Sequence, residues 1–195
     1  MPEKNELTAI VLAGGKSTRM KQDKGLISLH GKMMIEHVIG KMIKIAGHII
    51  IITQNPAYRQ FGFPCYKDSY KDKGPLAGIY TGLLHSTTQK NLVVGCDTPF
   101  LSGNMLKALI KSCSDEDVLI TEHEGKAEPL CAIYDRNCIP HFHKVLKQDK
   151  LKITDAISDL KTVVINFDRE NWMTKDEFAN INTPEELNKF DQSIK

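Results

Sequence analysis

Residues 10–26, IVLAGGKSTRMKQDKGL, combine an apolar run, two adjacent glycines and four cationic side chains. Because Gly14 and Gly15 lack side chains, successive backbone N–H groups can turn toward the oxygens of a phosphate. Arg19 offers a planar fork of donors that matches a phosphate group, and Lys24 adds a movable point charge. The stretch therefore predicts a phosphate-binding loop. The alternative is a glycine turn followed by a solvated basic loop.

Two widespread phosphate loops do not fit this stretch. A Walker A loop needs a glycine five residues before Gly15, and that position holds Ile10. The dinucleotide fingerprint G-x-G-x-x-G fails because Lys16 stands where its second glycine would follow Gly14. The loop thus belongs to some other class of phosphate site.

A carboxylate follows the apolar run at 92–96. Asp97 comes directly after this run and before Thr98 and Pro99, so a buried strand would deliver it to the edge of a sheet. Magnesium takes one or two protein carboxylates and completes its shell with phosphate oxygens and water. We therefore interpret Asp97 as a magnesium ligand. The alternative is a helix cap, a role for which Ser102 is better placed.

Strand-like and helix-like patterns alternate along the chain. Expected strands cover residues 10–13, 48–53, 92–96, 118–121, 130–134 and 163–167, and expected helices cover 33–46, 76–86 and 102–112, with a last helix capped by Thr183. Such alternation predicts an α/β fold in which helices cover both faces of a mostly parallel sheet. Ligands of such sheets bind beyond the carboxyl ends of the strands, where the glycine loop and Asp97 would lie. We expect residues 1–195 to form one domain.

Composition excludes several classes of protein. The net charge is only +2, which does not favour nucleic acid or a membrane surface as a partner. The charged start MPEKNELTAI does not resemble a signal peptide, and no apolar run reaches the ~18 residues of a membrane span. Five cysteines without a CxxC pair predict reduced thiols and a cytoplasmic location.

Four motifs in order carry a resemblance to a known family. They are LAGG-x-S-x-RM-x-x-DK, GPLAG, CDTP and NINTPEEL. Together they resemble the molybdenum cofactor guanylyltransferases, nucleotidyltransferases that join GMP from GTP to molybdopterin and release pyrophosphate. The resemblance covers residues 10–187. It implies a three-layer αβα, Rossmann-like nucleotidyltransferase fold with a mixed, mostly parallel sheet.

The resemblance also implies roles for individual residues. Those expected to bind the nucleotide are Leu12, Ala13, Gly14, Gly15, Lys24, Asn55, Asp68, Asp97, Asn180 and Asn182. Arg19, Lys24 and Asp97 would be catalytic, and Asp97 would hold Mg²⁺. Asp68 would accept hydrogen bonds from the guanine edge, with Asn55 lining the same pocket. Taken without the other motifs, Asp68 fits a solvated turn residue better than a base contact.

The acceptor side is less well marked. The strand around Pro129 and Leu130, together with Lys150 and Lys152, would lie toward the pterin. The resemblance also implies other proteins of molybdenum cofactor synthesis or insertion as partners. One alternative is a related CTP-dependent or sugar-phosphate enzyme, although cytidylyl relatives usually read LAAG where this chain has Gly14. A second alternative is a non-catalytic GTP-binding partner of molybdoenzyme maturation, which would not need Arg19, Lys24 and Asp97 together.

Overall fold

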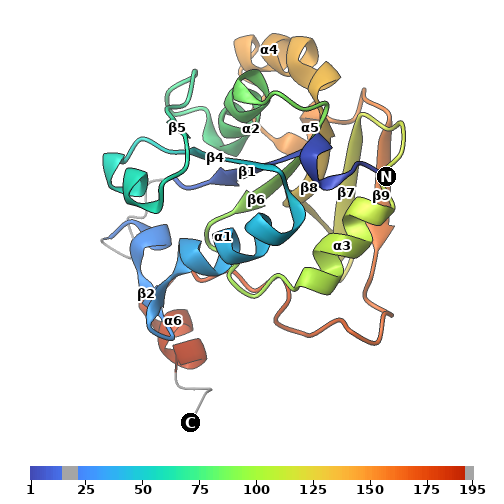
Figure 1. Cartoon of the computed structure of the whole chain (residues 1–195). Coiled ribbons are helices and arrows are strands. Elements are labelled where there is room, and N and C mark those ends of the chain that lie inside the picture. The colour runs from blue at the N-terminus through green and yellow to red at the C-terminus, as the bar shows by residue number, and fades with distance from the viewer. Residues whose placement is uncertain (15–21, 192–195) are drawn as a thin grey trace.

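A single mixed sheet forms the centre of the protein in a computed structural model, which describes residues 1–14 and 22–191 (Figure 1). In spatial order its strands are β5 (Cys65–Tyr66), β4 (His48–Ile52), β1 (Leu7–Leu12), β6 (Lys90–Gly95), β8 (Lys126–Asp135), β7 (Val118–His123) and β9 (Thr162–Asn166). Neighbouring strands are parallel except at β8, which runs antiparallel to both β6 and β7. The expected mostly parallel sheet is confirmed.

Helices cover both faces of the sheet. The helices α1 (Met34–Ile45) and α3 (Gly103–Lys111) pack on one face, where Ala9 and Val11 of β1 are buried. On the other face, where Ile10 is buried, lie α2 (Gly74–His85), α4 (Ile139–Lys147) and α5 (Ile153–Ala156). The central strands β1, β4 and β6 are buried from both sides, as their continuous apolar runs predict. The three-layer αβα fold is confirmed.

Short elements complete the chain. They are the 3-10 helices η1 (Lys4–Glu6), η2 (Lys24–Leu26), η3 (Pro56–Phe61) and η4 (Arg136–Cys138), the hairpin of β2 (Ser28–Leu29) and β3 (Lys32–Met33), and the last helix α6 (Pro184–Asp191). Within the described ranges, no helix is both long enough and apolar enough to cross a membrane. All five cysteines are free thiols.

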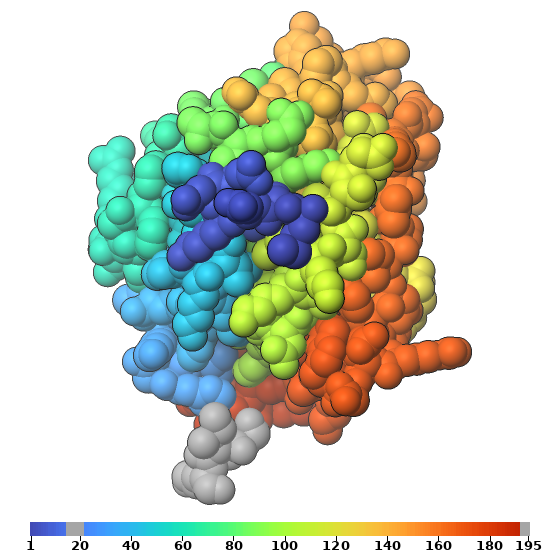
Figure 2. All heavy atoms as spheres, turned by 45° about the vertical axis from the view of Figure 1, so that its right-hand side comes forward, coloured from blue at the N-terminus to red at the C-terminus, as the bar shows by residue number. Residues whose placement is uncertain are grey.

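The first residues lie at the amino ends of the strands. Residues 1–6 precede β1 and are dark blue in Figure 2, where they pack against the surface beside α3. The Lys4 carbonyl accepts a hydrogen bond from Gly47 N at 2.6 Å. This segment therefore lies at the end of the sheet opposite the carboxyl ends of the strands.

The chain returns to the carboxyl edge after β9. Residues 167–183 run along one side of the molecule to α6, which lies next to the β2–β3 hairpin (Figure 1). There Leu187 and Phe190 of α6 pack against buried Leu29 and Met34. The fully buried Glu177 anchors this return segment, because its carboxylate accepts a hydrogen bond from Ser102 N at the start of α3. An anion at a helix N-terminus is favourable.

One glycine allows α2 to approach the sheet closely. A Cβ on Gly82 would lie 2.5 Å from Cγ2 of Ile10, which is fully buried in β1. We expect Gly82→Ala to lower the free energy of unfolding by about 1–3 kcal/mol, because overpacking shifts the backbone of a filled core. Thermal unfolding measures this loss of stability, because each kcal/mol lowers the Tm of a protein of this size by ~2–4 °C.

The matched control is Gly40→Ala in α1. Gly40 is an exposed helical glycine, and a Cβ there would meet no neighbour within 4 Å among the described atoms. That substitution is expected to stabilise the protein by up to about 1 kcal/mol through helix propensity. A Gly82→Ala protein as stable as Gly40→Ala would contradict close packing of α2 on β1.

Candidate active site

The glycine turn begins where three strands end. Cys96 N, just after β6, donates a hydrogen bond to the Leu12 carbonyl at 3.0 Å, and Ala13 N donates to the Ile52 carbonyl at 2.9 Å. Leu12 and Ala13 are thus held between β4 and β6, and the exposed Gly14 follows them. Gly15 and Arg19 lie outside the described residues, so their roles stay predictions.

Three of the residues predicted from the sequence meet at this edge. The Lys24 ammonium lies 3.4 Å from Oδ2 of Asp97 and donates a hydrogen bond to Oδ1 of Asn182. The Ile181 N–H, next to Asn182, donates to the Asp97 backbone carbonyl at 3.1 Å. About a quarter of each charged side chain stays exposed, 23% for Lys24 and 26% for Asp97. A cation, a carboxylate and an amide are therefore within reach of a bound ligand.

The turn after β6 determines where the Asp97 carboxylate lies. A Cβ on Gly95 would come within 2.7 Å of Oδ1 of Asp97, so the carboxylate folds back over Gly95 and a larger residue there would displace it. The Thr98 hydroxyl closes the same turn by donating to the Gly95 carbonyl at 3.0 Å. Ser102 caps α3 instead, with its hydroxyl accepting from Met105 N at 3.1 Å, as predicted. Asp97 therefore does not cap this helix.

The structure adds a residue that the sequence analysis did not single out. Asp23, within the DK motif, accepts hydrogen bonds from the hydroxyl of Tyr58 and from Nδ2 of Asn55, the latter at 3.0 Å. Oδ1 of Asn55 accepts from Ala57 N at 3.0 Å and so caps η3. Both polar atoms of the Asn55 amide are therefore engaged at the loop that precedes Lys24. The predicted contact of Asn55 with a base stays a prediction.

Burial keeps Tyr58 in its neutral form. Its side chain is fully buried. Burial first, and the neighbouring Cys96 and Asp23 groups next, raise the pKa of Tyr58 far above its usual range. The hydroxyl therefore remains protonated and donates to the Asp23 carboxylate. Burial also raises the pKa of the Cys96 thiol, which suits packing and not nucleophilic chemistry.

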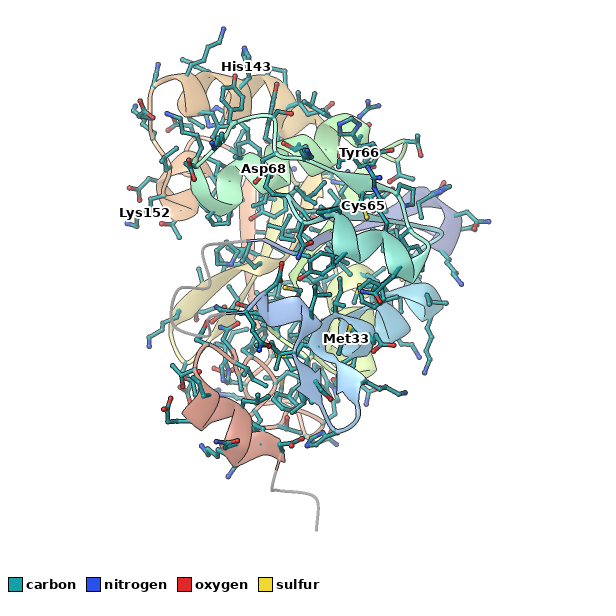
Figure 3. All side chains as sticks on the ribbon, turned by 90° about the vertical axis from the view of Figure 1, so that its left-hand side faces the viewer. Met33, Cys65, Tyr66, Asp68, His143 and Lys152 are labelled. Carbon is teal, nitrogen blue, oxygen red and sulfur yellow. The ribbon has the colours of Figure 1, made fainter. Side chains whose placement is uncertain are left out.

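Asp68 lies near the glycine turn but on a different loop. Asp68 comes two residues after Tyr66, the last residue of β5, and both are labelled in Figure 3. Its Oδ1 would lie 3.5 Å from a Cβ on Gly78 of α2. The same Cβ would lie 3.1 Å from Leu12, so Asp68 and Leu12 share one side of α2. Oδ1 of Asp68 is buried and has no hydrogen-bond partner within the described part of the chain.

A buried oxygen without a hydrogen-bond partner, such as Oδ1 of Asp68, destabilises the folded protein unless a ligand donates a hydrogen bond to it. Burial raises the pKa of the Asp68 carboxyl, and a hydrogen bond with Gln54 acts in the opposite direction. The loop itself is held in place, because Ser69 N donates to the Thr81 hydroxyl at 2.9 Å. Asp68 is thus a fixed acceptor, and one of its oxygens has no donor in residues 1–14 and 22–191.

The remaining predicted residues include Asn180, Leu130 and Lys152. Asn180 is exposed and precedes the buried Ile181, so its role stays a prediction. Leu130 of β8 lies beside the end of β6, where its Cδ1 would be 3.9 Å from a Cβ on Gly95. Lys152, labelled in Figure 3 below the helix that carries His143, is exposed and pairs with Asp155 at 2.9 Å. The contacts of Leu130 and Lys152 with a pterin stay predictions.

A family model described as a MobA-like NTP transferase domain matches residues 9–162. Among curated proteins, a probable molybdenum cofactor guanylyltransferase of Flavobacterium johnsoniae is 36% identical over 184 residues, covering 93% of this chain and 95% of the relative. A protein with the same name from Carboxydothermus hydrogenoformans is 35% identical, with 94% of each chain covered.

A solved structure has the same fold. It is the molybdopterin-guanine dinucleotide biosynthesis protein A of Archaeoglobus fulgidus, with a TM-score of 0.77 and 26% identity over 94% of this chain and 96% of that chain. The family match, the full-length relatives and the fold agree with the resemblance carried by the four motifs. The chain belongs to the family of MobA-like NTP transferases, which includes the molybdenum cofactor guanylyltransferases.

Proposed function

We propose that this protein transfers the GMP unit of GTP to molybdopterin, forming molybdopterin guanine dinucleotide and releasing pyrophosphate. The observation that carries the proposal is the meeting of Lys24, Asp97 and Asn182 at the edge where β1 ends and the chain continues to Gly14. A cation and a carboxylate beside a glycine turn suit a nucleoside triphosphate with its metal ion. The names of the full-length relatives support guanine over cytosine as the base.

The reaction is one displacement at phosphorus. A phosphate oxygen of molybdopterin bonds to the α-phosphorus of GTP, and the bond from that phosphorus to the bridging oxygen breaks. The electron pair leaves with pyrophosphate. Because the attacking oxygen is already anionic, no general base is needed. What remains for the protein is positioning and neutralisation of charge.

The residues of the chain divide this task. Lys24 donates to the departing pyrophosphate and offsets its growing charge, together with Arg19. The backbone amides of Gly14 and Gly15 hold the phosphates at the turn. Lys24 starts from a fixed position, because Asp97 and Asn182 hold its ammonium group before the triphosphate arrives.

Asp97 fits a magnesium ion. No group of three or more His, Cys, Asp or Glu side chains that could cage a metal is found in the parts of the chain that the structure describes. Magnesium needs no such cage, since one carboxylate with phosphate oxygens and waters completes its shell. Asp97 is partly exposed and held in a fixed turn, as such a ligand should be. When bound, the ion would supply charge neutralisation at the phosphates.

Asp68 selects the base in this proposal. Its carboxylate is half-buried and accepts hydrogen bonds from N1–H and the exocyclic amine of guanine. These bonds complete the buried Oδ1, which has no partner among the described residues. Adenine and cytosine do not present that pair of donors. Asn55 and Asn180 line the nucleotide site around it.

The wider setting follows from the same proposal. Residues 1–195 act as one nucleotidyltransferase domain, with GTP and molybdopterin as substrates and other proteins of cofactor synthesis or insertion as partners. We place the enzyme in the cytoplasm, where five free thiols stay reduced. The acceptor phosphate lies on the side of Lys150, Lys152 and Leu130.

The test is a nucleotide panel with the purified protein, Mg²⁺ and molybdopterin, read as pyrophosphate release and as thermal shift. GTP at 100 times its Kd should stabilise the protein by about 2.7 kcal/mol, and ATP, CTP and UTP by far less. Asp68→Asn should weaken GTP selectively, because a site built for hydrogen bonds can discriminate by roughly 10⁴-fold. Equal shifts with CTP and GTP, or an unchanged GTP affinity in the variant, would contradict the assignment.

A further inference from the structure

The carboxylate of Asp23 has a donor on each oxygen. The Tyr58 hydroxyl donates to Oδ1, and Nδ2 of Asn55 donates to Oδ2 at 3.0 Å. Both donors come from the segment that follows β4, more than thirty residues along the chain. Asp23 therefore joins the glycine-loop segment to the neighbouring strand end, and does so beside Lys24.

The two donors are themselves rigid. Tyr58 is fully buried and its ring packs near Phe61, with the ring centroids 6.0 Å apart. Asn55 is held by its cap on Ala57 N and by its own N–H, which donates to the Thr53 hydroxyl at 3.1 Å. A Tyr side chain has only two rotatable bonds, so a buried one is a stiff anchor. The position of the Asp23 carboxylate is thus set by groups that move little.

The backbone on both sides of Lys24 is held in place by a hydrogen bond and by close packing. Asp23 precedes the short turn η2, in which Leu26 N donates to the Asp23 carbonyl at 3.0 Å. A Cβ on Gly25 would collide with the Tyr58 hydroxyl and would lie 3.1 Å from Sγ of Cys96. The backbone at Gly25 therefore fills the space between Tyr58 and the residue before Asp97. A shift of the Tyr58 hydroxyl would therefore displace both Asp23 and Gly25, the residues on either side of Lys24 in the sequence.

We propose that Asp23 and Tyr58 are positioning residues that place the Lys24 ammonium between Asp97 and Asn182. Lysine is a point charge on a flexible four-carbon stem, so its reach depends on where its backbone is fixed. Charge neutralisation in a transition state requires placement within about 0.5 Å. This inference rests on the proposed function, because it assigns a role in the transfer reaction to a pair that does not touch the substrate.

The test is a double-mutant cycle of Tyr58→Phe and Lys24→Ala. Tyr58→Phe removes one hydroxyl and keeps the ring, and it should lower kcat about tenfold or more with KM for GTP within about twofold, since small misplacements of catalytic groups are costly. In the Lys24→Ala background the same change should alter kcat by less than about twofold, because coupled residues are not additive. Asp23→Asn, the second variant, should behave in the same way.

The matched control is Thr8→Val. Thr8 is fully buried, and its hydroxyl pairs with that of Thr88 at 2.7 Å at the amino end of β1, away from the site. It should lower Tm as Tyr58→Phe does, with kcat unchanged. Equal fractional losses of kcat from Tyr58→Phe in both backgrounds, or no loss in either, would overturn the proposal and leave the transferase function standing.

A measurement that does not depend on turnover separates the positioning role of Asp23 and Tyr58 from the proposed transferase function. Amine-reactive labelling of Lys24, followed by mass spectrometry, reports how firmly the side chain is held in the absence of substrate. Tyr58→Phe should speed labelling of Lys24 severalfold and leave Lys161, on the far surface, unchanged. Unchanged labelling of Lys24 would overturn the positioning role. Failure of the wild-type protein to release pyrophosphate from GTP would overturn only the proposed function.

Discussion

Asp97→Asn is expected to reduce pyrophosphate release from GTP by about 10³-fold or more while the protein stays folded. A metal ion at a phosphoryl group stabilises the transition state by several kcal/mol, and each 1.36 kcal/mol is tenfold in rate. Folding should tolerate the change, because Asp97 lies after the strand, is partly exposed and pairs with Lys24 at 3.4 Å. Such pairs contribute about 0–1 kcal/mol. Steady-state kinetics and thermal unfolding measure the two effects.

Asp115→Asn is the control for this variant. Asp115 is an exposed carboxylate that pairs with Lys161 at 2.6 Å on another surface, so its loss should leave turnover unchanged. Raising the Mg²⁺ concentration should restore part of the activity of Asp97→Asn if the side chain acts through the metal. Turnover of Asp97→Asn within tenfold of wild type would remove Asp97 as the principal metal ligand.

Lys24→Ala is expected to lower kcat by about 10²- to 10³-fold, the typical loss for one preorganised charge-stabilising donor. The KM for GTP should rise much less, since an interaction that strengthens in the transition state shows in kcat. The ammonium group already lies between Asp97 and Asn182, so its removal changes the site while the fold stays intact. Initial rates over a range of GTP concentrations measure the split.

Two lysines serve as comparisons for Lys24. Lys161→Ala removes an exposed ammonium group far from the site and should have no effect on kcat. Lys16→Ala tests the type of loop, because that lysine would be indispensable in a Walker A loop and should matter little here. An inactive Lys16→Ala protein beside an active Lys24→Ala protein would mean that the glycine loop belongs to another class.

The elements of the fold follow from local patterns. The helix expected over 33–46 runs from Met34 to Ile45, and the strand expected over 48–53 runs from His48 to Ile52. Thr183 caps the last helix as predicted, with its hydroxyl accepting from Glu186 N at 3.2 Å. Apolar periodicity and caps act between residues a few positions apart, so a single sequence contains them. The four motifs are also short local patterns, so the sequence alone was enough to indicate the family.

Contacts between distant segments were decided only by the tertiary structure. The place of β8 between β6 and β7 depends on sheet pairing, which no local pattern reports. The sequence showed Asp23 only as part of a motif, and its partner Tyr58 was not singled out. Folding joins the two and so fixes the turn that carries Lys24. The sequence by itself determined which residues could do the chemistry, and long-range packing decided what holds them in place.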